Sequence, residues 1–129
     1  MSEINSHAAL EGRRVLVVED EPFIAMTLED MLTDLGCIVA GSAGQVGDAL
    51  ALIESCEIDA AVLDVNLGSQ KIDPVADALA ARGMPYIFTT GYGRTGVPVS
   101  HAAHGVVQKP FRMEDLAKAL AEELQRGTG

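Results

Sequence analysis

The chain has 129 residues, of which 48% are hydrophobic, so it has the size of one domain that can bury a core without disulfides. Its formal net charge of −10 would repel a nucleic-acid backbone, and we therefore expect no nucleic-acid partner. No run of about 18 apolar residues occurs, so we expect no membrane partner.

The start of the chain lacks the basic and apolar segments of a signal peptide. We expect residues 1–12 to be a short mobile leader, residues 13–126 to form the domain, and residues 127–129 to be a tail. Cys37 and Cys56 stand among apolar or small residues without metal-ligand spacing. This setting is typical of reduced thiols, which predicts a cytoplasmic protein.

The first elements are a strand and a helix. The valine-rich run at 14–18 predicts a strand buried on both faces. Pro22 suits the first turn of a helix and Gly36 supplies a stop, so we predict a helix over 22–35. Further strands are predicted at 37–41, 59–64, 85–90 and 105–109, and further helices at 46–55, 74–83 and 113–126.

Strands that alternate with helices predict an α/β fold with a parallel sheet covered on both faces. We expect a flavodoxin-like (βα)5 doubly wound domain with five parallel strands in the order 2-1-3-4-5. The segment 91–105 is rich in glycine, contains Pro98 and lacks helical periodicity. It therefore predicts an irregular or short fourth helix.

Acidic residues follow the first strand and end the third. Glu19, Asp20 and Glu21 come directly after 14–18, and Asp64 closes the third strand. The expected strand order places these two strands side by side, where two carboxylates about 4 Å apart repel by roughly 4 kcal/mol. A bound cation would relieve this repulsion, and Mg²⁺ prefers such oxygen ligands.

Two further polar residues, Thr90 and Lys109, stand at the ends of the predicted strands 85–90 and 105–109. A carboxylate such as Asp64 can attack phosphorus, while Lys109 and Thr90 can bind the phosphoryl oxygens. Each residue also has an ordinary structural interpretation: Asp64 and Thr90 as turn residues, Lys109 as a solvated loop lysine, and Glu21 as an acid favoured at a helix start. Their joint occurrence at the expected strand ends favours a functional site.

The stretches "VLVVEDEP", "AAVLDVNL", "IFTTGYG" and "QKPF" together resemble the receiver domains of two-component response regulators, over about residues 13–126. The resemblance implies Asp20 as a direct Mg²⁺ ligand and Glu19 as a second one, often through water. It also implies that Asp64 binds the metal and that Asn66 contributes its backbone carbonyl.

The resemblance further implies that Asp64 accepts a phosphoryl group from a histidine kinase, assisted by Thr90 and Lys109. The output would pass to a downstream protein that the sequence does not identify. Receivers typically carry an aromatic residue where this chain has Val106. This departure and the irregular segment 91–105, together with the stretch "FTTGY", resemble an alphaproteobacterial subgroup marked by a Phe-Ala-Thr-Gly-Tyr-like motif. Thr89 stands here in place of the alanine of that motif.

Two alternatives remain. The chain is expected to be a stand-alone receiver, but it can also be a receiver taken from a hybrid kinase. A haloacid-dehalogenase-like phosphatase uses a similar residue set, but it needs a second acid where this chain has Asn66. We therefore expect a signalling module that assists only its own phosphoryl transfer and is otherwise no enzyme.

Overall fold

The computed structural model describes residues 6–91, 97–98 and 105–128, with side chains described from residue 8 to residue 125 within these ranges. A five-stranded parallel sheet forms its centre, in the order β2-β1-β3-β6-β7. The strands are β1 (Arg14–Val18), β2 (Ile38–Ala43), β3 (Ala60–Asp64), β6 (Tyr86–Thr90) and β7 (Val106–Gln108). In chain order this is 2-1-3-4-5, so the predicted flavodoxin-like topology is confirmed.

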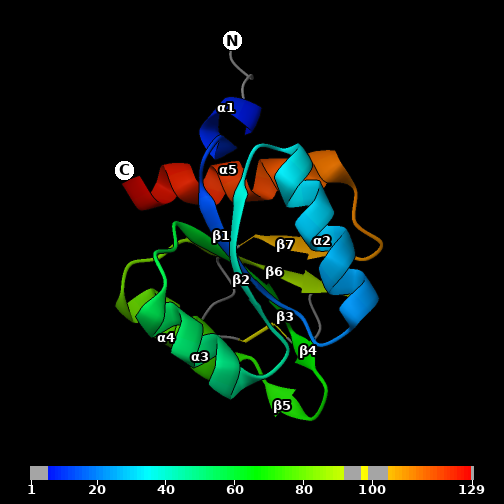
Figure 1. Ribbon diagram of the computed structural model, residues 1–129, viewed down its shortest axis with the longest axis vertical. Coiled ribbons are helices and arrows are strands. Elements are labelled where there is room, and N and C mark those ends of the chain that lie inside the picture. Colours follow the sequence, from blue (N-terminus) through cyan, green and yellow to red (C-terminus); the bar gives the residue numbers. More distant parts are fainter. Residues whose placement is uncertain (1–5, 92–96, 99–104, 129) are drawn as a thin grey trace.

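Helices cover both faces of the sheet (Figure 1). One face carries α2 (Pro22–Asp34) and α5 (Met113–Thr128), and the other carries α3 (Val46–Ser55) and α4 (Asp73–Ala81). Leu28 and Leu120 pack with Val17 on the first face, and Ile53 and Leu79 pack with Leu16 on the second. Successive strand residues point to opposite faces, so each strand contributes to both halves of the core.

The central position of β3 explains its apolar sequence. It lies between β1 and β6, and all five of its residues are buried. A strand covered on both faces needs a continuous apolar run, which "AAVL" supplies. The run ends at Asp64, so the carboxyl end of the sheet receives a buried acid.

Part of the expected leader, Ser6–Leu10, is folded. Residues Ser6–Leu10 form a short helix, α1, which lies beside α5 (Figure 1). Leu10 is fully buried in the same core cluster as Leu120. The last residues of the expected leader therefore belong to the packed domain. The sequence signal was weak because a helix of five residues shows little periodicity.

The segment after Asp64 contains a hairpin that the sequence analysis did not predict. Its strands β4 (Asn66–Leu67) and β5 (Gln70–Lys71) pair antiparallel, and Gly68 takes a positive φ of 61° at the turn. Residues 92–96 and 99–104 lie outside the described residues, so the expected irregular fourth helix stays a prediction. Both cysteines are free, as predicted.

Candidate functional site

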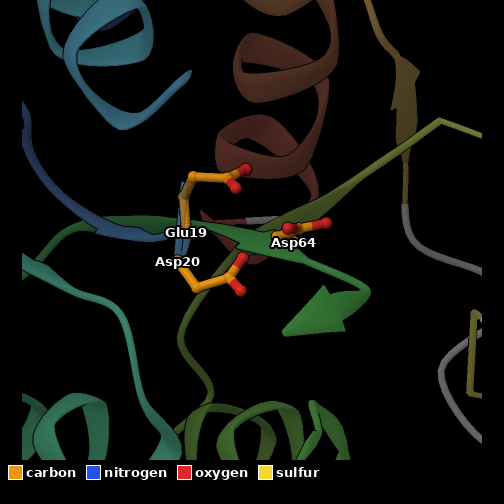
Figure 2. A group of neighbouring side chains, drawn as sticks. All are labelled: Glu19, Asp20 and Asp64. Carbon is orange, nitrogen blue, oxygen red and sulfur yellow. The ribbon is translucent and has the colours of Figure 1, made fainter. Parts of the chain in front are cut away.

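Three carboxylates meet at the carboxyl end of the sheet (Figure 2). Glu19 and Asp20 directly follow β1, and Asp64 is the last residue of β3. The two strands pair in register through Val18 and Leu63, so their ends lie next to each other. One oxygen from each carboxylate lies within 4.8 Å of the others. The convergence expected from the sequence is therefore present.

The two adjacent acids occupy different environments. The side chain of Glu19 is buried, with 3% exposure of the residue, whereas Asp20 is exposed. Figure 2 shows their carboxylates on opposite sides of the chain end, as expected for consecutive residues of an extended strand. Glu19 thus faces the layer of α2 and α5, and Asp20 faces solvent.

Lys109 joins Glu19 to Asp64. Its Nζ lies 3.2 Å from Oε1 of Glu19 and 3.3 Å from Oδ2 of Asp64. Lys109 follows β7, which β6 separates from β3, so its side chain reaches past the end of β6 to make these contacts. Lys109 is therefore part of the site and not a solvated loop lysine, the alternative that the sequence left open.

The electrostatics of this group follow from burial. Burial and the neighbouring charge of Asp64 raise the pKa of Glu19 to about 7. Burial acts to lower the pKa of Lys109, but the charges of Asp64 and Glu19 and hydrogen bonds to both raise it above its ordinary value. Lys109 therefore stays protonated, and it stabilises ionised carboxylates at this end of the sheet.

Backbone groups fix the orientation of two of the carboxylates. The Glu21 N–H donates to Oε2 of Glu19 at 3.1 Å, and the Asn66 N–H donates to Oδ1 of Asp64 at 3.1 Å. Glu21 is the N-cap residue of α2, at the helix start where the sequence analysis placed it, but its side chain makes no capping hydrogen bond. The first residue of the hairpin strand β4 thus orients the acid that ends β3.

A cleft of about 440 Å³ opens over the site, and Asp20, Asp64, Asn66 and Lys109 are among its lining residues. The carboxylates of the cluster offer oxygen atoms as metal ligands, the ligand type that Mg²⁺ prefers. The described residues therefore fit a divalent cation of this kind, with Asp20 and Asp64 both lining the cleft.

Two adjacent threonines end β6. Thr90 is fully buried and its carbonyl accepts a hydrogen bond from the Lys109 N–H at 2.8 Å. Thr89 pairs with Asp64 in the sheet, and its buried hydroxyl has no hydrogen-bond partner among the described residues. The sequence analysis noted Thr89 only as a departure from a motif. Thr89 shares a face of β6 with the core residue Ile87, two positions earlier, so strand alternation could have indicated that the Thr89 hydroxyl is buried.

Comparison with known proteins gives one matching family, described as response regulator receiver domain, over residues 15–121. The solution structure of SdrG from Sphingomonas melonis Fr1 is 50% identical, with a TM-score of 0.79, and the match covers 90% of this chain and 98% of that one. The BeF3-activated conformation of SdrG from Pseudomonas melonis Fr1 is also 50% identical, with a TM-score of 0.74, covering 86% of this chain and 95% of that one.

A sequence relative is the transcriptional regulatory protein PdtaR from Mycobacterium tuberculosis, which is 31% identical over 119 residues. The match covers 88% of this chain but 58% of PdtaR, so the chain spans little more than half the length of that relative. Among the described residues, no helix combines the length and the apolar character needed to cross a bilayer.

Proposed function

Because the chain belongs to the response regulator receiver domains of two-component systems, we propose that it accepts a phosphoryl group from a histidine kinase on Asp64, with Mg²⁺ as cofactor. The observation that carries the proposal is the convergence of Glu19, Asp20 and Asp64 with Lys109 at the carboxyl end of the sheet. The carboxylates offer oxygen ligands for Mg²⁺, and the ion together with Lys109 would offset the negative charge that enters with the phosphoryl group.

In the proposed reaction, a carboxylate oxygen of Asp64 attacks the phosphorus of a phosphohistidine. An O–P bond forms, the P–N bond breaks, and its electron pair stays on the imidazole, which takes up a proton. Mg²⁺, when bound, would neutralise charge on the phosphoryl oxygens. Glu19, Asp20 and Asp64 would hold it, together with the backbone carbonyl of Asn66.

Lys109 supplies the fixed positive charge. Its ammonium already lies 3.3 Å from Asp64, so a phosphoryl group on that carboxylate would lie within its reach. Thr90, at the end of the neighbouring strand β6, would donate its hydroxyl to a phosphoryl oxygen. The cleft beside Asp64 leaves space for the donor to approach.

We further propose a cytoplasmic regulator rather than a catalyst acting on other substrates. Its phosphorylated form would act through a downstream protein. The similarity to SdrG in a conformation described as BeF3-activated supports a phosphate-dependent conformational change. BeF3 with Mg²⁺ is therefore a suitable probe for this chain.

Intact-mass analysis after incubation with acetyl phosphate and Mg²⁺ tests the proposal. We expect the wild type to gain the mass of one phosphoryl group, and Asp64→Asn to gain none. Asp34→Asn is the control, because the exposed Asp34 is the last residue of α2 and lies outside the carboxylate cluster. Labelling of Asp64→Asn at the wild-type level, or turnover of a phosphomonoester by the wild type, would contradict the proposal.

A further inference from the structure

The hairpin after Asp64 is anchored at its base and exposed at its tip. Leu67 in β4 and Ile72 directly after β5 are almost fully buried, whereas Gly68, Ser69 and Gln70 are exposed. Two-residue strands give the hairpin few hydrogen bonds of its own. The position of its tip therefore depends on contacts with the rest of the domain.

Gln70 makes such a contact. Its side-chain Oε1 accepts a hydrogen bond from the backbone N–H of Val46, the first residue of α3, at 2.8 Å. The N-cap residue of this helix, Gln45, makes no side-chain capping bond. Gln70 thus supplies, from 24 residues away, an acceptor for one of the N–H groups that a helix start leaves without a partner.

The two segments that this bond joins lie on either side of Asp20. A Cβ atom at Gly44, just before α3, would lie 3.5 Å from Cα of Asp20. A Cβ atom at Gly68, in the hairpin turn, would lie 3.5 Å from Oδ2 of Asp20. These residues and Gln70 line one hollow of about 530 Å³ beside the carboxylate cluster. The hydrogen bond between Val46 and Gln70 therefore joins the two segments that flank the exposed side chain of Asp20.

We propose that Gln70 is a positioning residue for the part of the site that contains Asp20 and the hairpin. By bonding Val46, it holds the hairpin against Asp20 and thereby fixes Asn66, whose N–H orients Asp64. The inference rests on the proposed function, because it assigns Gln70 to the proposed Mg²⁺ site. A free hairpin would have to be ordered when the ion binds, and this ordering would weaken binding.

The test uses backbone NMR of the full chain. Mg²⁺ is titrated into the wild type and Gln70→Ala, with the shifts of the Asn66 and Gly68 amides as the measure of binding. Exchange of the Val46 amide with water reports the hydrogen bond itself. We expect Gln70→Ala to weaken Mg²⁺ binding by about three- to tenfold, the effect of one lost hydrogen bond, and to speed Val46 exchange.

Matched variants separate the effect of the hydrogen bond between Val46 and Gln70 from the effect of an added negative charge. Gln70→Glu keeps the acceptor oxygen, so it should restore both slow Val46 exchange and Mg²⁺ affinity. The double variant Ser69→Glu with Gln70→Ala adds the same charge one residue away without the acceptor, so it should not restore slow Val46 exchange. Ser69→Ala should match the wild type in both measurements.

Each contrary result has one meaning. Wild-type Mg²⁺ affinity in Gln70→Ala, with or without faster Val46 exchange, would overturn the inference while the proposed function stands. Recovery of affinity in the double variant without slow Val46 exchange would also overturn it, because charge alone would then suffice. A wild type that shows no Mg²⁺-dependent shifts would overturn the inference and the proposed metal site together.

Discussion

The two sides of the carboxylate cluster differ in how their charge is balanced. On the side of α2 and α5, Glu19 and Asp64 are buried and share the ammonium of Lys109. On the side of the hairpin, Asp20 is exposed and faces an acidic hollow that also contains Asp48. On the first side one ammonium balances part of the charge of two carboxylates, whereas the second side is open to a cation from solvent. We call them the paired side and the open side.

Removing the cation of the paired side should have the largest effect on stability. Lys109→Met leaves two buried carboxylates without their ammonium, and breaking a buried ion pair in this way costs about 3 kcal/mol. We expect a fall of that size in the free energy of unfolding, measured by urea denaturation at pH 8 with a chelator present.

Arg112→Met is the matched control for this substitution. Arg112 and Glu114 form an ion pair of 3.4 Å, but their side chains are 71% and 72% exposed. Solvent screens such a pair, so we expect a change within about 0.5 kcal/mol. Equal losses in the two variants would show that the pairing of Lys109 contributes no more than a surface contact.

The open side should dominate the affinity for Mg²⁺. Asp20→Asn removes a carboxylate that lines the cleft, and we expect it to weaken Mg²⁺ binding by more than about tenfold, or about 1.4 kcal/mol. Glu21→Gln removes an acid beside it that lies outside the carboxylate cluster, so its effect should be smaller. Isothermal titration calorimetry measures both, and comparable losses would mean that the metal lies elsewhere.

The paired side should also make stability depend on pH. The pKa of Glu19 is raised from 4.5 to about 7 in the folded chain, so the folded state binds more protons than the unfolded state between these values. Stability should therefore fall as pH rises from about 4.5 to about 7 in the metal-free protein. Glu19→Gln cannot ionise, so urea denaturation should show a shallower decline in this window. Parallel profiles for the two chains would contradict the assignment.

The sequence predicted the convergence of the three carboxylates well, because chain order alone determined it. Glu19, Asp20 and Asp64 stand at the ends of two apolar runs, and parallel topology brings such ends together. Even the burial of Glu19 follows the alternation of side chains after Val15 and Val17, which face the same core cluster. The strand boundaries moved by one or two residues without changing this outcome.

Features that depend on tertiary position were not predictable in the same way. The hairpin has two-residue strands, too short to show a period of two, and the bond from Val46 to Gln70 spans 24 residues. The packing of Leu10 against the core depends on where α5 passes. The reach of Lys109 past the end of β6 depends on a side-chain conformation that no sequence pattern encodes.

The smallest expected effect concerns Thr89, which faces the paired side together with Ile87 and Val107. Its buried hydroxyl has no hydrogen-bond partner within the part of the chain that the structure describes, and burying such a group costs roughly 1 to 3 kcal/mol. Valine has nearly the same shape, so Thr89→Val should raise the free energy of unfolding by about 1 kcal/mol. Thr27→Val is the control, because the exposed Thr27 hydroxyl donates to the Phe23 carbonyl at 2.9 Å; there we expect no gain. If Thr89→Val lowered stability, the Thr89 hydroxyl would have a hydrogen-bond partner in solution, and Asp64, which pairs with Thr89 in the sheet, would be the candidate acceptor.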